Sequence, residues 1–208
     1  MVLKLMRKRR SIRRFTPEPL SKETLVKLVE AAITAPSASN KQPWRFLIVR
    51  DRDSIESAAR VVDEERWRLI DMLSPEFRDD FKDYSRSFTL FRYAPALIVP
   101  LYRAFSGLSG MLDREKTDEK HMSFQQALES HSALISISTA IQNILLMAEE
   151  LEIGACCMTG PLIAKHGLEK ILKVPQGWQI AALIATGRPD EQPDDPGRKH
   201  LKSFVRWL

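Results

Sequence analysis

The run Arg9-Arg10-Ser11-Ile12-Arg13-Arg14-Phe15 is the stretch around which the rest of this chain can be interpreted. It places four guanidinium groups and one hydroxyl within a few residues. A guanidinium is a rigid fork of donors that matches phosphate oxygens two at a time, and a serine hydroxyl can donate to the same oxygens. The run therefore predicts a binding site for a dianion, which could belong to a nucleic acid, a membrane headgroup or a cofactor.

The basic charge of the chain is concentrated near this run. The 208 residues contain 32 basic and 27 acidic side chains, for a formal net charge of +5. Seven of the cations lie in residues 1–14, which contain no acid, so 25 basic residues face 27 acidic ones in the remainder. A nearly neutral body argues against a basic face built for a long polyanion, and we expect no nucleic-acid partner.

Composition favours one domain, residues 1–208, with a substantial core, because 44% of the residues are hydrophobic and 28% are charged. The N-terminus has no apolar segment long enough for a signal peptide, and no run approaches the roughly 18 apolar residues of a membrane span. We therefore expect a cytoplasmic protein with no membrane partner. Cys156 and Cys157 are adjacent, a spacing that rarely meets disulfide geometry, and are expected to be reduced and buried.

Hydrophobic periodicity and turn residues predict the elements of the chain. The predicted helices are 3–8, 22–34, most of 52–93 with a break at Ser74-Pro75, 123–151 and a segment after Pro161, and the predicted strands are 44–49, 96–102, 154–158 and 178–186. The longest helix is expected to begin at Ser123, which opens a Ser-x-x-Gln capping box. Leu134, Ile137 and Ile144 share one face of it, and small residues cover the others. Such a helix suits a dimer contact, although a purely internal position is equally compatible with the pattern.

Three predicted loops carry polar side chains. Residues 35–43, Ala-Pro-Ser-Ala-Ser-Asn-Lys-Gln-Pro, offer hydroxyl and amide groups without net charge, which suits the edge of a flat heterocycle as well as a solvated turn. Residues 105–121 are polar and contain glycine, as expected of a mobile loop over a site. The acidic residues between 190 and 195 are expected to be solvated.

The C-terminal third adds one more candidate site and an apolar tail. Thr159-Gly160-Pro161 is predicted to form the turn between a strand and a helix. The first backbone amides of that helix are free to face an electron-rich atom. Beyond a second basic cluster that includes Arg198, the tail Phe204 to Trp207 has nothing local to pack on.

Together these pieces resemble the FMN-dependent nitroreductase family. The resemblance is carried by Arg-Arg-Ser-Ile-Arg near the N-terminus, Ala-Pro-Ser-Ala-Ser-Asn-Lys-Gln-Pro-Trp-Arg-Phe one helix later, the turn near 154–161, and Ile-Ala-Thr-Gly-Arg-Pro followed by a late arginine. It covers residues 7–50 and 130–208, and 51–122 match no motif. It implies an α+β fold with a mainly antiparallel central sheet flanked by helices, in an intertwined homodimer with FMN at the subunit interface.

The resemblance also implies which residues bind the flavin. The implied phosphate and ribityl contacts are Arg9 and Arg13, with Arg10 and Ser11 on the same strip and Arg198 closing on the phosphate. The loop implied to lie along the flavin, supplied by one subunit to a site shared with the other, contributes Pro36, Ser37, Ser39, Asn40 and Gln42. The segment implied to lie near flavin N5 is Met158, Thr159 and Gly160. Several relatives have a Glu-Gly pair at Thr159-Gly160, which changes the charge beside the ring.

The function implied is an NAD(P)H-dependent flavin oxidoreductase that reduces a small electron-poor acceptor, such as a nitroaromatic or a quinone, by a ping-pong mechanism. No catalytic side chain is expected because the flavin carries the chemistry, and no metal is expected because the four histidines lack ligand spacing. The alternatives are a reductive dehalogenase or a flavin-consuming enzyme on the same fold, a flavin-binding protein without turnover, and a nucleic-acid-binding basic protein.

Overall fold

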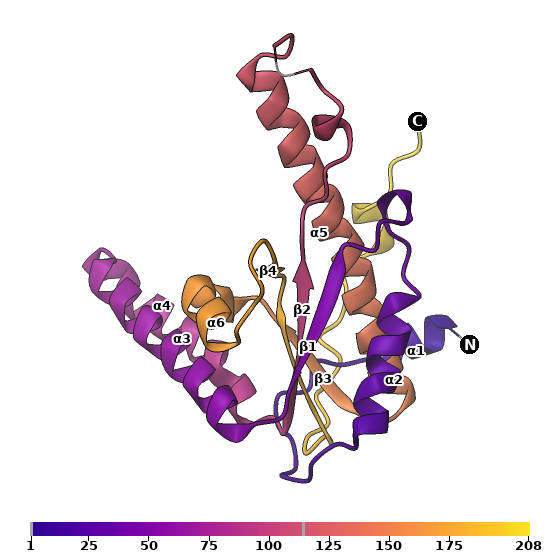
Figure 1. The fold of residues 1–208 in the computed structure, drawn as a ribbon. Helices are drawn as coiled ribbons and strands as arrows, with labels where there is room; N and C mark the ends of the chain where they lie inside the picture. The colour runs from indigo at the N-terminus through magenta and orange to yellow at the C-terminus, as the bar shows by residue number, and fades with distance from the viewer. Residues whose placement is uncertain (1, 114) are drawn as a thin grey trace.

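An antiparallel sheet separates two layers of helices in the computed structural model, which describes residues 2–113 and 115–208 (Figure 1). The strand order is β1-β2-β5-β3, and the short β4 pairs with β2 beyond the end of β5. Helices α2 and α5 pack on one face of the sheet, and α3 and α6 pack on the other. The predicted α+β class and antiparallel sheet are therefore confirmed.

The elements follow the predicted order. The α-helices are α1 (Val2–Lys8), α2 (Lys22–Ile33), α3 (Arg52–Met72), α4 (Pro75–Ser85), α5 (Glu119–Glu150) and α6 (Lys165–Ile171), and the strands are β1 (Trp44–Val49), β2 (Ala96–Tyr102), β3 (Gly154–Met158), β4 (Gln179–Ile180) and β5 (Leu183–Gly187). Short 3₁₀ helices are η1 (Ala38–Asn40), η2 (Arg86–Tyr93), η3 (Leu108–Gly110), η4 (Gly160–Ala164) and η5 (Leu201–Ser203).

Strand β2 is buried along its whole length because it is covered on both faces. Leu97, Val99 and Leu101 pack into the core under α3 and α6, while Ala96 and Ile98 pack into the core under α2 and α5. Successive side chains of a strand point to opposite faces, so a strand covered on both sides must be apolar throughout. This is why 96–102 reads as an unbroken apolar run.

The predicted strand 178–186 is interrupted by a bulge. Ile98 pairs with Ile184 and Leu101 pairs with Ile180, so one extra residue lies on the β4–β5 side between these pairs. Pro100 lies opposite the break and has no N–H to donate, although its carbonyl accepts from the Ala181 amide at 2.9 Å. A proline inside a sheet is tolerated at such a bulge, which explains why the single predicted strand becomes two.

Helix α5 begins before the predicted capping box. Asp118 is the N-cap, and its carboxylate accepts from the His121 amide at 2.9 Å, so Ser123 lies inside the helix. Aspartate and serine are both good N-caps, and the acidic residue upstream is the one used here. The first turns of α5 and the loop before it extend beyond the sheet as an arm (Figure 1).

The buried face of α5 agrees with the prediction at Ile137 and Ile144 but not at Leu134. Ala133, Ile137, Ala140 and Ile144 are fully buried, whereas Leu134 is 40% exposed. Small side chains let α2 and the sheet approach the helix closely, so they belong to the core side and not to the outer side. By length and composition alone α5 could also cross a bilayer, with an 18-residue window of mean hydropathy 1.3, but core helices meet the same criterion.

Candidate functional site

The arginine run lies in extended conformation against the edge of the sheet. The Ile12 amide donates to the Ala155 carbonyl of β3 at 3.1 Å, and the Thr16 amide donates to the Arg188 carbonyl at 3.0 Å. Gly154 of β3 makes this approach possible, because a Cβ there would lie 2.8 Å from the Ile12 side chain. The sheet thus fixes the backbone of the run and sets the positions of its side chains.

Arg10 and Arg14 form ion pairs that join the N-terminal run to the C-terminal segment. The Arg10 guanidinium donates to the carbonyls of Arg7, Lys8 and Arg9 at the end of α1, and pairs with Asp195 at 3.1 Å. Arg14 pairs with Glu191 at 3.2 Å.

Glu191 also accepts from the backbone amides of Arg13 and Arg14, and these contacts lower the pKa of its carboxyl against the opposing effect of burial. The expectation that the acidic loop is solvated is therefore wrong for Glu191, which is half-buried, whereas Asp195 is exposed as expected although it pairs with Arg10. The two carboxylates tie the C-terminal segment to the arginine run.

Arg9, Ser11 and Arg13 gather around the buried thiol of Cys156. Burial raises the pKa of this thiol, while the charges of Arg13 and Arg9 and a hydrogen bond with Ser11 oppose the rise. Among the described residues the Arg13 guanidinium makes one hydrogen bond, to the Ser11 carbonyl at 3.4 Å, and the Arg9 guanidinium makes none. Two guanidinium groups without a carboxylate partner are what an anionic ligand requires.

A cavity of about 170 Å³ joins this cluster to the predicted turn. It is lined by Arg13, Tyr84, Ser87, Phe88 and the segment 156–161, which includes Met158, Thr159 and Gly160. The structure thus brings Arg13 and the predicted N5 segment to one hollow. A Cβ on Gly160 would lie 2.4 Å from the Phe88 ring, so only glycine lets the turn pack this closely.

Three lining residues are absent from the sequence prediction: Tyr84, Ser87 and Phe88. Phe88 and Ser87 lie in η2, and Tyr84 lies at the end of α4. No local motif marks them, since it is the contact between Phe88 and Gly160 that places them at the cavity. The only sequence feature that could have pointed to these lining residues is the presence of aromatic side chains in an otherwise charged helical segment.

The loop 36–42 lies apart from the arginine cluster within the protomer. It is fixed to α5, where the Ala38 amide donates to Ser136 Oγ at 3.3 Å and Thr139 Oγ1 donates to the Pro36 carbonyl at 3.2 Å. Within the described residues no hydrogen bond joins the loop to the arginine run.

The backbone of this loop is strained, with positive φ at Ser39 (50°), Asn40 (52°) and Gln42 (48°). Ser37 Oγ supports the strained turn by accepting from the Gln42 amide at 3.0 Å. Positive φ in non-glycine residues carries an energetic cost and is concentrated at binding sites.

Arg198 lies in the exposed C-terminal segment, where its guanidinium donates to the Gly197 carbonyl at 2.6 Å. The pair between Arg10 and Asp195 fixes the chain three residues before it. Three residues span at most about 11 Å, so Arg198 is tethered near the N-terminal run.

The cavity offers no metal site and no ionised thiol. No group of three His, Cys, Asp or Glu side chains converges in the part of the chain that the structure describes. Burial raises the pKa of Cys157 to about 11, so this thiol is protonated at neutral pH. Both cysteines are free thiols, with Cys156 buried and Cys157 half-buried.

A sequence profile of the nitroreductase family matches residues 6–188 of the chain. The chain belongs to the nitroreductase family. Relatives of this nitroreductase-family chain have diverse names. It is 27% identical to iodotyrosine deiodinase of Thermotoga neapolitana, over 99% of this chain and 95% of the relative. It is 29% identical to 5,6-dimethylbenzimidazole synthase of Rhodospirillum rubrum, over 93% of this chain and 84% of the relative.

Solved structures share the fold of this nitroreductase-family chain. A BluB-like flavoprotein from Clostridium difficile 630 superposes with a TM-score of 0.87 at 23% identity, over 100% of this chain and 99% of that chain. A nitroreductase with bound FMN from Desulfitobacterium hafniense superposes with a TM-score of 0.70 at 21% identity, over 100% of this chain and 97% of that chain. These likenesses concern the fold. They agree with the sheet and helix layers described above.

Proposed function

We propose that this chain is an FMN-dependent oxidoreductase that uses NAD(P)H to reduce a small electron-poor acceptor by a ping-pong mechanism. The observation that carries the proposal is that Arg13, whose guanidinium has no carboxylate partner among the described residues, lines one cavity with the turn at Met158–Gly160, in a member of the nitroreductase family. A cation cluster suits a phosphate, and a hollow lined by backbone and aromatic rings suits a flat heterocycle.

The residues present fit FMN. Arg9 and Ser11 would hold the phosphate, with Arg13 on the ribityl side, and Arg198 is tethered close enough by Asp195 to join them. When bound, FMN supplies the two-electron chemistry between the nicotinamide and the acceptor. The protein's part is to orient the ring, supply cationic charge beside it and limit access of water. Thr159 leaves that edge of the cavity without a carboxylate, so the net local charge is positive.

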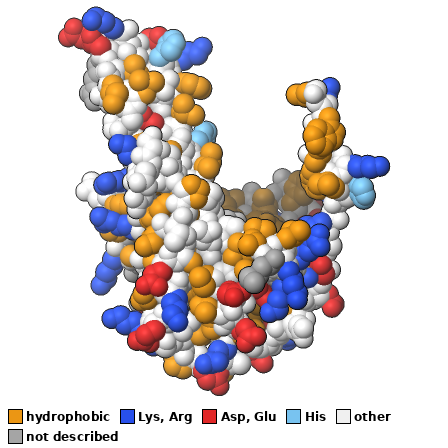
Figure 2. Space-filling model, turned by 90° about the vertical axis from the view of Figure 1, so that its right-hand side faces the viewer, with side chains coloured by type: hydrophobic (Ala, Val, Ile, Leu, Met, Phe, Trp, Pro, Cys, Tyr) orange, Lys and Arg blue, Asp and Glu red, His pale blue; other side chains and the backbone are white. Residues whose placement is uncertain are grey.

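The loop 36–42 is assigned to the cavity of the partner protomer in a homodimer. Its strained residues lie away from the arginine cluster of their own chain, and the apolar tail after Arg198 is exposed. Phe204 and Trp207 are 67% and 91% exposed, and Figure 2 shows this end of the chain standing clear of the body. A site shared by two copies accounts for both features.

The experiment is an absorbance titration of purified apoprotein with FMN, followed by anaerobic addition of NADH and then NADPH. We expect a protein-bound flavin spectrum that is bleached by one or both nicotinamides and restored by an electron-poor acceptor. A protein that leaves added FMN free in solution would refute the proposal. A bound flavin that neither nicotinamide bleaches would favour binding without this turnover.

A second candidate reaction is reductive dehalogenation, which the similarity to iodotyrosine deiodinase favours. The same flavin site would serve both reactions, so the distinction lies in the product. Halide release from a halogenated phenol under reducing conditions would support dehalogenation, and amine or hydroxylamine formation from a nitroarene would support nitro reduction. Loss of flavin absorbance during turnover in air would instead indicate an enzyme that consumes the flavin.

A further inference from the structure

Two arginines and a tryptophan gather at the end of the sheet from which the arm extends. The guanidinium carbon of Arg45 lies 4.5 Å from the centre of the Trp178 ring, and that of Arg103 lies 5.0 Å from it. Both arginines are exposed, and the indole is half-buried. We call these three residues the Trp178 cluster. None of them lines the cavity that Arg13 shares with the turn at 156–161.

The pleat of the sheet explains why these side chains meet. Arg45 of β1 lies opposite Leu101 of β2, and Leu101 lies opposite Ile180 of β4. Leu101 and Ile180 both pack into the core under α3 and α6. Because every second side chain of a strand shares a face, Arg103 and Trp178 continue this face beyond the last core residues. The Trp178 ring packs against that core and gives the arginines a fixed surface.

The cluster brings two like charges to one ring without a compensating acid. Within residues 2–113 and 115–208, neither guanidinium makes an ion pair or a hydrogen bond. The cation–π contacts favour each arginine separately, but they do not remove the repulsion between the two charges. An anion bound by both guanidinium groups would remove it.

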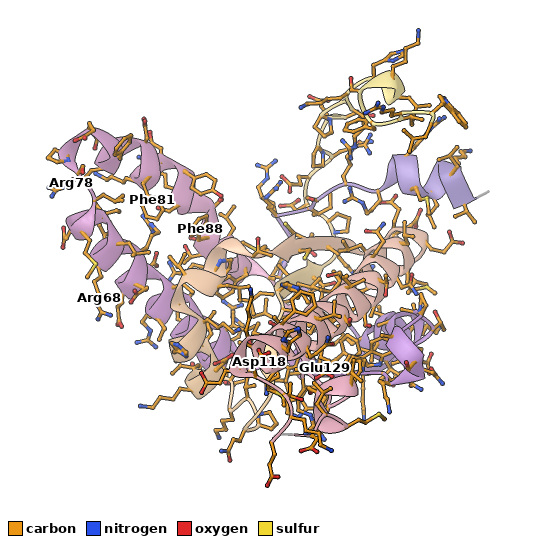
Figure 3. All side chains as sticks on the ribbon, turned by 90° about the horizontal axis from the view of Figure 1, so that it is seen from above. Arg68, Arg78, Phe81, Phe88, Asp118 and Glu129 are labelled. Atoms are coloured by element: carbon orange, nitrogen blue, oxygen red, sulfur yellow. The ribbon has the colours of Figure 1, made fainter. Side chains whose placement is uncertain are left out.

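The acids of the neighbouring elements have other partners. Glu169 of α6 accepts from a backbone amide of β4 at 3.4 Å. In the arm that follows Arg103, Asp118 caps α5 and Glu129 accepts from two backbone amides of the preceding loop. Figure 3 shows Asp118 and Glu129 on α5, in a view from above. Over its described residues, the chain therefore supplies no acid to the Trp178 cluster.

Two guanidinium forks favour a phosphate monoester over a monoanion. Each fork presents a planar pair of donors that matches two phosphate oxygens, and a dianion balances both positive charges at once. The indole supports the guanidinium groups before a ligand arrives, so less conformational entropy is lost on binding. The exposed cluster thus fits a terminal phosphate group that reaches it from solvent.

The cluster lies where the loop 36–42 joins the sheet. Gln42 is three residues from Arg45, a span of at most about 11 Å, and the Arg103 amide donates to the Pro43 carbonyl at 3.1 Å. The proposed function assigns this loop to the flavin of the partner protomer. A long ligand with one end at that flavin would therefore extend its other end toward the cluster. NADPH is such a ligand, because its phosphate monoester is on the adenosine, at the end remote from the nicotinamide.

We propose that Arg45 and Arg103, supported by Trp178, bind a phosphate monoester dianion, and that the 2′-phosphate of NADPH supplies it. The phosphate site stands on the cluster alone. Its assignment to NADPH rests on the proposed function, since the nicotinamide must lie at the flavin beside the loop 36–42. The cluster would then make the enzyme prefer NADPH to NADH, which lacks this phosphate.

The test compares Arg45→Ala, Arg103→Ala and Arg50→Ala, each saturated with FMN so that the other cation cluster is occupied. Arg50 is the matched control because it is an exposed arginine just beyond the opposite end of β1. Calorimetry measures the Kd of 2′-AMP, of inorganic phosphate and of adenosine, which has no phosphate. Steady-state kinetics measure kcat/KM for NADPH and for NADH.

We expect Arg45→Ala and Arg103→Ala each to raise the Kd of 2′-AMP by roughly 10-fold or more, the scale of one hydrogen bond between charged groups. The same variants should lower kcat/KM for NADPH by a similar factor and leave that for NADH unchanged. Arg50→Ala should behave like the wild type. The Kd values of adenosine and FMN should not change in any variant, which also verifies that the variants are folded.

The outcomes separate the site from its ligand. Weaker phosphate binding in Arg45→Ala, with an unchanged ratio of NADPH to NADH activity, would support the phosphate site and make free phosphate its source. Equal Kd values for 2′-AMP and phosphate in the wild type and in both cluster variants would overturn the site. Wild-type protein that binds no FMN would overturn the proposed function and the NADPH assignment, while the Kd values of 2′-AMP and phosphate would still decide the phosphate site.

Discussion

The arginines of the N-terminal run lie within five residues of one another but have different roles. Arg10 and Arg14 are paired with Asp195 and Glu191, and so their charges are used to fasten the two ends of the chain together. Arg9 and Arg13 have no carboxylate partner in the described part of the chain. Sequence alone cannot distinguish the paired arginines from the unpaired ones, because the acids that pair with Arg10 and Arg14 lie more than 170 residues away in the chain.

Arg13→Ala should weaken FMN binding by about 1.5–3 kcal/mol, the scale of one hydrogen bond to a charged group, which is roughly 10- to 150-fold in Kd. Flavin fluorescence quenching measures the change. Arg14→Ala is the control: this residue pairs with Glu191 and does not line the cavity, so its removal should change the Kd by less than about twofold. Identical FMN affinity in wild type and Arg13→Ala would remove Arg13 from the site.

Gly160→Ala should destabilise the fold because the new Cβ would lie 2.4 Å from the buried Phe88 ring. Overpacking of this kind costs about 1–3 kcal/mol, which urea unfolding would detect. Phe88→Leu makes room for the methyl group, so the double variant should lose less stability than the two single losses combined. Additive losses would show that the Phe88 contact is not the reason for glycine here.

At the scale of elements, patterns of local spacing were sufficient to predict most helices and strands. Helix α2 behind Ser21, strand β1 and strand β2 lie where periodicity predicts them. Where the predicted elements differ from the observed ones, the cause is a contact between residues far apart in the chain. The predicted strand 178–186 is split because Pro100 of a neighbouring strand cannot donate to it, and a sequence does not show which strands are neighbours.

Part of the predicted loop 105–121 is helical, and its segment 107–109 is anchored by a carboxylate of α5. Glu129 is 9% exposed and accepts from the amides of Gly107 and Ser109, each at 2.9 Å, and from the Ser109 hydroxyl at 2.5 Å. These hydrogen bonds, led by that of the Ser109 side chain, lower the pKa of Glu129. None of the described residues in 105–113 and 115–121 lines the cavity with Arg13, so the place of this loop over a site stays a prediction.

Glu129→Gln should loosen this loop. The amide keeps the shape but loses the charge, so hydrogen exchange at Gly107 and Ser109 should quicken by roughly tenfold, the effect of about 1.4 kcal/mol. Exposed Glu119→Gln is the control.

Because the folded pKa of Glu129 lies below the ordinary 4.5, the hydrogen bonds of its carboxylate to the loop are complete above that pH and are lost as pH falls through the lowered value. Pepsin cleavage of the loop should therefore rise with acidity in the wild type relative to Glu129→Gln.

At the scale of the whole molecule, the residues that we assign to the flavin lie in two separate regions of the protomer. The arginine cluster and the cavity lie at the edge of β3, whereas the strained loop 36–42 is fixed to α5 on the other side of the sheet. The resemblance to nitroreductases could assign both sets of residues to a flavin. Under the proposed function, their union in one site would need a second chain.

Trp207→Ala is therefore expected to weaken self-association. Trp207 is 91% exposed in a tail that contacts little of its own protomer, and a tryptophan buried at an interface contributes about 2 kcal/mol or more. Sedimentation over a dilution series should show a dimer whose dissociation constant rises by at least roughly 30-fold in the variant. Trp67→Ala, at a residue 49% exposed on α3, should leave the dissociation constant unchanged. If the tail instead stays in solvent, wild type and Trp207→Ala will sediment identically at every concentration, and the loop 36–42 will need another explanation for its strain.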